Sequence, residues 1–194
     1  MKQNFLKKSI EQNIDVHNKI IDLHSEIKIA AFKILNTFKK KNRIFICGNG
    51  GSAADAQHLA AEFLVRLRPN VNRKPFPIIS LAQDTSTITA CANDYSFEKL
   101  FSRNLEALYS TGDLLITIST SGKSKNILDV LKFAKKNKIY SISLLGNKGG
   151  SAKKITNLPI VVDCKDVARI QECHIFIGHI LLEWVEDELL KKEK

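Results

Sequence analysis

Five short β-prone runs alternate with helical stretches along most of the chain, and this alternation restricts the possible folds more than any other feature. The runs are Arg43–Cys47, Ile78–Ala82, Asp113–Ile118, Ile139–Leu145 and Leu158–Asp163. Strands that alternate with helices form a parallel sheet covered by helices on both faces. The sequence therefore predicts the α/β class.

Apolar residues at helical spacing fill the segments between the runs. Residues 1–41 contain neither glycine nor proline, so we predict one long helix or two packed helices with a break near residue 22. The other predicted helices are about Ala53–Leu67, Thr85–Ala92, Phe97–Tyr109, a helix after Ser124 that ends at about Asn137, and Val167–Leu190. The length of 194 residues suits one domain, and no linker or low-complexity segment divides it. We expect a single domain over residues 1–194.

The chain is basic, with 30 Lys and Arg against 20 Asp and Glu and a formal charge of +10. Such a charge can attract phosphorylated metabolites, nucleic acid or acidic membranes. The basic residues are spread over Lys7–Lys8, Lys39–Arg43, Lys132–Lys138 and Lys191–Lys194, mostly at helix ends. Lysine near a helix C-terminus is favoured by the helix dipole and needs no ligand. We therefore interpret the charge as a solvated surface and do not expect nucleic acid as a partner.

The chain carries none of the usual signs of export. Met1–His17 alternates charged residues with single apolar ones, unlike a secretory leader. Apolar stretches such as Ile175–Val185 are too short and too interrupted to span a bilayer. The four cysteines are Cys47, Cys91, Cys164 and Cys173. None of them forms a C-x-x-C pair, so we expect reduced thiols in a soluble, cytoplasmic protein with no membrane partner.

Two predicted strand-to-helix loops carry chemistry suited to phosphate. In parallel α/β sheets, ligands bind outside the carboxyl ends of the strands. The first loop, Gly48–Ser52, combines three glycines, which let the backbone approach a ligand, with polar Asn49 and Ser52. The second loop, Ser119–Ser124, places four hydroxyls at a helix N-terminus, where exposed N–H groups favour an anion. One hydroxyl could serve as a helix cap, but four exceed what a cap requires, so we predict phosphate binding here.

Two nucleotide-binding motifs resemble these loops only in part. The run Gly48–Ala53 matches the loose G-x-G-x-x-A dinucleotide fingerprint, but Arg66–Lys74 offers no acid to hold a ribose. Gly122–Ser124 resembles the end of a P-loop, but Thr117 stands where that motif needs its first glycine. We therefore expect no nucleotide cofactor.

Imidazole and carboxylate groups line one side of two predicted helices. His58 and Glu62 are four residues apart and share a face of the helix after the first loop. Gln171 and His179 share a side of the last helix, with His174 between them. Each set alone is more often a surface or core feature than a site, but their position behind an anion loop favours a site. A carboxylate and an imidazole can move a proton between adjacent carbons of a sugar, and the same donors with an oxygen ligand would suit zinc.

The motifs of this chain, taken together, resemble those of the phosphoheptose isomerases, which have the sugar isomerase (SIS) fold. The run Cys47–His58, with the sequence CGNGGSAADAQH, resembles their first signature. Asn93-Asp94, Ile118–Gly122 and Arg169–His174 match the later signatures in order and spacing. The resemblance spans nearly the whole chain, including the helical N-terminus.

The resemblance implies a five-stranded parallel sheet flanked by helices, and a homotetramer with active sites at subunit interfaces. Residues 1–41 would pack on the domain and in oligomer contacts. The implied reaction converts sedoheptulose 7-phosphate to D-glycero-D-manno-heptose 7-phosphate through an enediol. It would begin the supply of nucleotide-activated heptose for surface polysaccharide such as lipopolysaccharide.

The resemblance also assigns roles to individual positions. Glu62 would remove the C1 proton of the ketose, and His179 would serve the carbonyl oxygen as an acid. One zinc ion per subunit would be held by His58, Glu62, Gln171 and His179. The residues implied to hold substrate are Asn49, Gly50, Gly51, Ser52, Glu62, Asn93, Asp94, Ser119, Thr120, Ser121, Ser124 and Gln171.

One position departs from the resemblance. Ala168 stands where many phosphoheptose isomerases carry an aspartate, and the pattern Ala168–Glu172 resembles that of the DnaA initiator-associating protein, a non-catalytic tetrameric SIS protein. That protein lacks the carboxylate and the imidazole that this chain has at Glu62 and His179, so the residues favour the enzyme. A sugar-phosphate-sensing regulator is disfavoured because residues 1–41 show no helix-turn-helix signal. The sequence also allows an isomerase of another sugar phosphate, because loops that bind phosphate do not determine the length of the sugar.

Overall fold

The central feature of the fold is one parallel sheet. The structure is a computed structural model that describes residues 3–81 and 84–191. The strands are β1 (Ile44–Gly48), β2 (Ile78–Ser80), β3 (Leu114–Ser119), β4 (Tyr140–Gly146) and β5 (Leu158–Val162). Their order across the sheet is β2-β1-β3-β4-β5, and every pair is parallel. The predicted α/β class and five-stranded parallel sheet are confirmed.

The strands β1 and β3 form the centre of the sheet, and all their residues are buried. Ile44 is in register with Leu114 and Gly48 with Ile118, so the two strands end at the same edge. The strand order reverses at this pair, because β2 lies beyond β1 while β4 and β5 lie beyond β3. In open parallel sheets such a reversal is the place where ligands bind.

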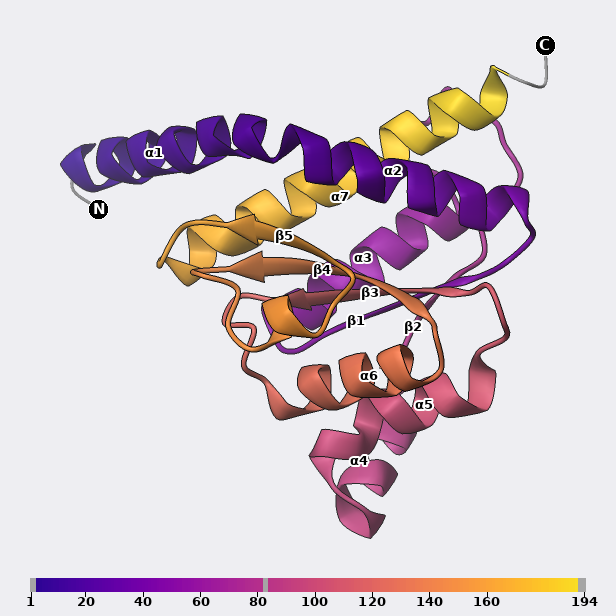
Figure 1. Cartoon of the computed structure of the whole chain (residues 1–194). Coiled ribbons are helices and arrows are strands. Elements are labelled where there is room, and N and C mark those ends of the chain that lie inside the picture. Colours follow the sequence, from indigo (N-terminus) through magenta and orange to yellow (C-terminus); the bar gives the residue numbers. More distant parts are fainter. Residues whose placement is uncertain (1–2, 82–83, 192–194) are drawn as a thin grey trace.

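Helices cover both faces of the sheet (Figure 1). Those on one face are α2 (His24–Lys39), α3 (Gly51–Leu64) and α7 (Val167–Leu190). Those on the other are α5 (Leu100–Leu108) and α6 (Lys125–Lys136), with α4 (Thr85–Asp94) beyond them. Each face has its own apolar core: Ile46 belongs to the first and Phe45 to the second. Neighbouring residues of a strand point to opposite faces, which explains why one strand supplies both cores.

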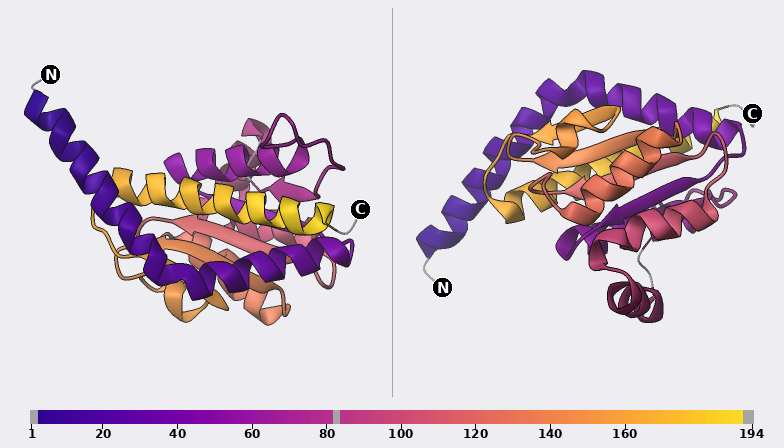
Figure 2. Two further views of the ribbon diagram at one scale, coloured as in Figure 1. Left: turned by 90° about the horizontal axis from the view of Figure 1, so that it is seen from above. Right: turned by 60° about the horizontal axis from the view of Figure 1, so that its bottom comes forward.

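The N-terminal segment forms two helices rather than one. α1 (Gln3–Asn18) and α2 are joined by a 3₁₀ turn at Lys19–Leu23, which confirms the break predicted near residue 22. α1 extends beyond the edge of the sheet (Figure 2), and Val16 is the one buried residue within its bounds. The apolar side chains of Phe5 and Ile14 are 63% and 53% exposed.

Several predicted boundaries are wrong, and the largest error has a tertiary cause. The helix predicted at Ala53–Leu67 is α3, which begins earlier and ends at Leu64. The carbonyl of Phe63 accepts hydrogen bonds from the Phe76 N–H (3.1 Å) and from Arg73 Nη1 (2.9 Å), two partners from a later loop. These bonds replace a further helical turn, and sequence periodicity does not reveal them.

Two other elements differ from the prediction. The helix predicted at Phe97–Tyr109 consists of a 3₁₀ turn, Phe97–Lys99, followed by α5. The strand predicted at Ile78–Ala82 ends at Ser80, although Leu81 still donates its N–H to the carbonyl of Ile46 at 2.9 Å. The predicted end at Ala82 lies outside the described residues. No helix among the described residues is long and apolar enough to cross a membrane.

Candidate active site

The two predicted phosphate loops lie at the same edge of the sheet, because β1 and β3 are neighbours that end together. The first loop leads into α3 on one face, and the second leads into α6 on the other face (Figure 1). Gly48–Ser52 and Ser119–Ser124 therefore flank the point where the strand order reverses. The sequence-based placement of these loops is confirmed.

The first loop is a tight turn that only glycine can make at two positions. A Cβ at Gly48 would lie 2.3 Å from the backbone oxygen of Ser52. Gly50 has φ +57°, in the region that favours glycine. The Ser52 N–H donates to the carbonyl of Asn49 at 3.1 Å, and the Ser52 side chain is buried. The turn thus leads directly into α3, which begins at Gly51.

A reciprocal amide pair joins the first loop to the helix after the second loop. Asn49 Nδ2 donates to Asn126 Oδ1 and Asn126 Nδ2 donates to Asn49 Oδ1, both at 2.8 Å. Asn126 is 2% exposed, and its Oδ1 also accepts from the Ile127 N–H at 2.9 Å. This pair fixes the two loops relative to each other across the sheet edge.

The hydroxyls of the second loop divide into two groups. Ser119 Oγ accepts from the Gly122 N–H at 3.1 Å, and Ser121 Oγ accepts from the Lys123 N–H at 3.2 Å, so these two shape the loop. Ser124 stands at the N-cap position of α6, but its hydroxyl makes no capping bond to the described chain. A role as a cap therefore does not account for Ser124, and its hydroxyl and the N-terminus of α6 are available for an anion.

The helices α3 and α7 run side by side and approach each other at glycines. A Cβ on Gly51 would lie 2.4 Å from Gln171 Nε2, so glycine lets the Gln171 amide reach the first loop. A Cβ on Gly178 would lie 2.5 Å from both methyls of Leu59. The Gly178 contact brings the helices together one residue away from both His58 and His179.

The predicted acid–base residues meet along this contact. His58 Nε2 lies 3.0 Å from His179 Nε2, and Glu62 Oε1 lies 3.8 Å from His58 Nε2. Glu62 Oε2 is buried and has no hydrogen-bond partner among the described residues. One turn before His58, burial raises the pKa of Asp55 to about 6, which the nearby His58 opposes. A carboxylate oxygen without a partner, close to two imidazoles, can accept a proton from a ligand carbon or hold a cation.

Of the four predicted zinc ligands, the structure places His58 beside His179 and Glu62 near His58, while Gln171 lies elsewhere. Two facing imidazole nitrogens, from His58 and His179, are the donors that zinc prefers. No group of three His, Cys, Asp or Glu side chains in residues 3–81 and 84–191 is arranged to hold a metal ion. Gln171, the fourth predicted ligand, lies against Gly51 at the start of α3, away from His58.

Other predicted site residues are not brought to this cluster. Asn93 and Asp94 lie exposed at the end of α4, where Asn93 Nδ2 donates to Asp94 Oδ1 at 2.8 Å. Within the described chain, α4 contacts α5 and the turn Phe97–Lys99, on the sheet face opposite α3 and α7. At a rise of about 1.5 Å per residue, Glu62 lies roughly 16 Å along α3 from Gly51. Within one chain, the predicted phosphate loops, the acid–base cluster and the Asn93-Asp94 pair therefore lie apart from one another.

Asn126 and Gly178 also shape the site, and local sequence patterns predict neither role. Asn126 is paired with a residue 77 positions away, and no local motif marks that pairing. Gly178 precedes His179 in the sequence, but a lone glycine in a helix does not reveal which helix packs against it. These two residues act through long-range contacts, which are invisible to a reading of local patterns.

Comparison with known proteins agrees with the fold and the motifs. The SIS domain model matches residues 10–146, more than half of the chain. The phosphoheptose isomerase of Campylobacter concisus is 44% identical over 186 residues, covering 94% of this chain and 97% of that protein. That of Chlorobaculum tepidum is 48% identical over 164 residues, covering 84% and 78%. The structure of the Neisseria gonorrhoeae phosphoheptose isomerase superposes with a TM-score of 0.89 at 33% identity, covering 95% of this chain and 98% of that one.

The parallel sheet, with the loops Gly48–Ser52 and Ser119–Ser124 at one edge, and the family match over residues 10–146 define a protein of the SIS class. Within it, the identities and coverages show that the chain belongs to the phosphoheptose isomerase family. None of these matches supports the non-catalytic initiator-associating protein. Ala168 is exposed in the first turn of α7, where its N–H donates to the capping Asp166 carboxylate at 2.9 Å.

Proposed function

We propose that this protein is an aldose–ketose isomerase that converts sedoheptulose 7-phosphate to D-glycero-D-manno-heptose 7-phosphate. The observation that carries the proposal is the position of the Glu62 carboxylate beside the His58–His179 contact. Its buried Oε2 has no hydrogen-bond partner within the part of the chain that the structure describes. Membership of the phosphoheptose isomerase family supports the same reaction.

The reaction needs one base, one acid and a phosphate anchor. Glu62 would take the C1 proton of the ketose and return a proton at C2, because no donor among the described residues occupies its Oε2. His179 would donate to the carbonyl oxygen as the enediol forms. The hydroxyls of Ser119–Ser124 and the N-terminus of α6 would anchor the phosphate, which holds the reacting carbons in place.

We also propose a divalent metal site at the same cluster, with zinc as the ion. The support is the pair of facing imidazole nitrogens of His58 and His179 with the Glu62 carboxylate nearby. Gln171 would complete the set as an oxygen donor. When bound, zinc would supply Lewis-acid polarisation of an oxygen on the substrate.

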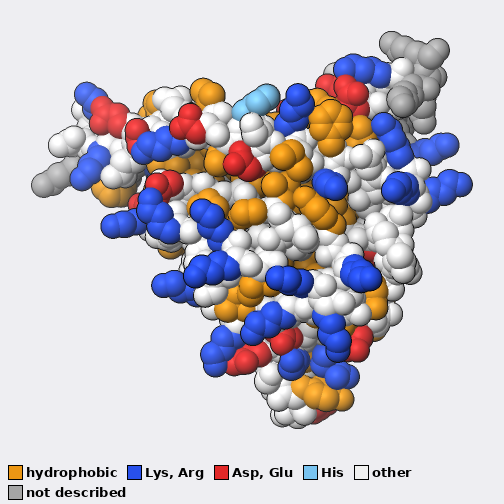
Figure 3. Space-filling view, viewed as in Figure 1, with side chains coloured by type: hydrophobic (Ala, Val, Ile, Leu, Met, Phe, Trp, Pro, Cys, Tyr) orange, Lys and Arg blue, Asp and Glu red, His pale blue; other side chains and the backbone are white. Residues whose placement is uncertain are grey.

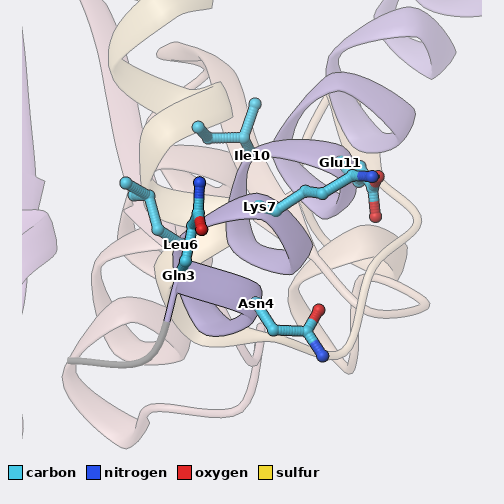
Figure 4. A pocket seen from close by; sticks show the side chains of 6 residues that line it. All are labelled: Gln3, Asn4, Leu6, Lys7, Ile10 and Glu11. Atoms are coloured by element: carbon cyan, nitrogen blue, oxygen red, sulfur yellow. The ribbon is translucent and has the colours of Figure 1, made fainter.

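A homotetramer is part of the proposal, because the separated site residues need a second chain to complete a site. The exposed apolar side of α1 supports it: Leu6 and Ile10 point the same way in Figure 4, in a hollow lined also by Gln3, Asn4, Lys7 and Glu11. That hollow is remote from the acid–base cluster, so we interpret it as a packing surface rather than a substrate pocket. A helix face of this kind is unfavourable in water and is suited to burial against another copy.

Neither a membrane nor a nucleic acid is part of the proposal. In Figure 3, Lys and Arg side chains are scattered over the visible face among acidic and apolar ones, which fits a solvated surface. All four cysteines are free thiols, which fits a reducing compartment, so we assign the enzyme to the cytoplasm. Its product would supply heptose for surface polysaccharide.

The test is conversion of sedoheptulose 7-phosphate, followed by proton NMR in D₂O, for the wild type, Glu62→Gln and His179→Ala. We expect the aldose with deuterium at C2, and a loss of roughly 10²–10⁴-fold in kcat for each variant, because each removes one proton-transfer group. Thermal unfolding of each variant checks that it remains folded. No turnover by the folded wild type, with or without added zinc, would refute the proposal. Binding to the replication initiator DnaA would then test the non-catalytic alternative.

A further inference from the structure

A buried ion pair ties α7 to the loop that follows α3. The Arg73 side chain is 2% exposed, Glu186 is 0% exposed, and Arg73 Nε donates to Glu186 Oε1. Glu186 Oε2 accepts from Arg68 Nε at 2.9 Å. Charges are rarely buried unless their partners are fixed, so this pair holds the loop firmly against α7.

The rest of the Arg73 guanidinium is directed at the end of α3. Its Nη2 donates to the carbonyl of Glu62 at 2.8 Å, and its Nη1 donates to the carbonyls of Phe63 (2.9 Å) and Lys74 (3.1 Å). The last carbonyls of a helix have no partner within the helix, so Arg73 supplies bonds that α3 cannot make itself. The guanidinium also lies 4.0 Å from the centre of the Phe76 ring.

These bonds make Arg73 a bridge between the helices that carry the acid–base residues. On α3 it holds the backbone of Glu62 itself. On α7 it holds Glu186, seven residues and about two turns after His179. The close contact at Gly178 lies on the other side of Glu62 along the helix pair. Glu62 is therefore held between two fixed points, one apolar and one ionic.

Direct contact between Arg73 and a substrate phosphate is excluded by the same geometry. All three guanidinium nitrogens are already bonded to protein oxygens, and the side chain is almost completely buried. Arg73 can act on the reaction only through the groups that it holds.

We infer that Arg73, together with Glu186, is a positioning residue that sets the place of the Glu62 carboxylate relative to His58 and His179. The inference rests on the proposed isomerase function for its effect on turnover. A lysine could pair with Glu186, but it is a single ammonium and cannot also bridge the carbonyls of Glu62 and Phe63. The arginine fork is thus required even where a positive charge alone would maintain the ion pair.

The experiment compares Arg73→Lys, the double variant Arg73→Met with Glu186→Met, and the control Arg68→Met. The double variant leaves neither buried charge unpaired, so it keeps the test valid if a single substitution at Arg73 fails to fold. Arg68 bonds to the same Glu186 and to Asp187 at 2.7 Å, but both of these partners belong to α7. Comparison of Arg68→Met with the Arg73 variants therefore separates the effect of the contacts with α3 from that of the contacts with α7.

We expect kcat to fall roughly 10–100-fold in Arg73→Lys and in the double variant, since displacement of a reacting group by about 1 Å has effects of this size. KM should stay within about threefold of the wild type, because the phosphate loops are untouched, and Arg68→Met should retain the wild-type kcat. Wild-type kcat in folded Arg73→Lys and in the folded double variant would overturn the inference, as would an equal loss in Arg68→Met.

A second readout needs no turnover. In protein with ¹⁵N-labelled histidine, the Nε2 signals of His58 and His179 report their 3.0 Å contact. We expect these signals to move in Arg73→Lys and to stay in place in Arg68→Met. If the wild type has no isomerase activity but the signals move as expected, the proposed function fails and the positioning inference stands. If the wild type is active and neither the signals nor kcat change in Arg73→Lys, the inference alone fails.

Discussion

At the scale of single residues, the amide pair between Asn49 and Asn126 is the most direct support for the predicted phosphate site. Local patterns identified Asn49 through its glycine-rich loop, whereas Asn126 is visible only after folding. Each amide donates one hydrogen bond to the other and accepts one from it. The pair therefore holds the loop ready for a ligand without occupying the ligand's place.

Replacing Asn126 by alanine should weaken substrate binding more than catalysis. The change leaves the Asn49 amide and the Ile127 N–H without a partner, at a cost of about 1–3 kcal/mol for each buried group left unpaired. We expect KM to rise roughly tenfold, with kcat changed less than threefold, because the acid–base cluster is on other helices. Steady-state kinetics on Asn126→Ala and on the control Asn70→Ala, at an exposed loop position, check this. A fall in kcat at unchanged KM would contradict the assigned role.

His174 gives a prediction for stability. Its ring is fully buried, and burial lowers its pKa from 6.5 to about 4, against a smaller opposing effect of a backbone bond at Leu145. Between these values the unfolded chain binds a proton that the folded protein does not, so the free energy of unfolding falls as pH decreases from 6.5 towards 4. The contribution reaches about 3 kcal/mol near pH 4 and is absent above pH 7.

Urea unfolding of the wild type and His174→Met at pH 7.5, 5.5 and 4.5 measures this contribution. The variant should lose less stability than the wild type over that range. The control His24→Gln, at an exposed position, should follow the wild type. Equal acid sensitivity of His174→Met and the wild type would show that His174 is not the source.

At the scale of elements, the contact of α3 with α7 determines whether the acid–base residues meet. Gly178 permits the approach, because any Cβ there would collide with the Leu59 side chain. Periodicity predicted both helices, and α7 was predicted at its observed bounds, but periodicity does not say which two helices touch. The meeting of His58 and His179 follows from that contact.

Substitution of Gly178 by valine should force the two helices apart. We expect destabilisation of about 1–3 kcal/mol from overpacking, and a loss of kcat of roughly tenfold or more as Glu62 moves. Adding Leu59→Ala should recover part of the kcat, because the colliding atoms belong to that one side chain. Thermal unfolding and kinetics of the single and double variants measure both effects. A Gly178→Val enzyme with wild-type kcat would contradict this account of the helix contact.

At the scale of the whole molecule, α1 packs over only a small part of its surface against its own chain, and Val16 is the one buried residue within its bounds. The helix extends past the sheet (Figure 2). Its apolar side chains Phe5, Leu6, Ile10 and Ile14 are exposed. Residues that one chain keeps apart, such as Glu62 and Asp94, could share a site only if another copy supplied one of them. Assembly and activity should therefore depend on each other.

The double variant Leu6→Glu with Ile10→Glu should abolish the tetramer, because it places two charges on the surface that would be buried. Native mass spectrometry should show four times 21.8 kDa for the wild type and smaller species for the variant. Activity should fall with the tetramer, while the control Lys8→Gln, at an exposed position of α1 that does not line the hollow beside Leu6 and Ile10, should retain both. A wild-type protein that is monomeric and fully active would contradict the proposed assembly.

The class of fold and most groups of the candidate site could be predicted from local sequence patterns. Short continuous apolar runs predict strands that are buried on both faces of a parallel sheet. Apolar residues at helical spacing predict helices that cover the sheet with one face. The loops at Gly48–Ser52 and Ser119–Ser124 could be placed because the carboxyl ends of parallel strands share an edge. These are local features, so one chain read in order contains them.

The way in which those groups are held depends on long-range packing, which local patterns do not contain. The early end of α3, the Asn49–Asn126 pair and the Arg73–Glu186 bridge each join residues that are remote along the chain. Such contacts depend on how the helices pack and on which donor each buried backbone carbonyl bonds to. The same local sequence pattern is compatible with many different partners. The sequence therefore identified Glu62 and His179, while packing determined that they lie along one helix contact.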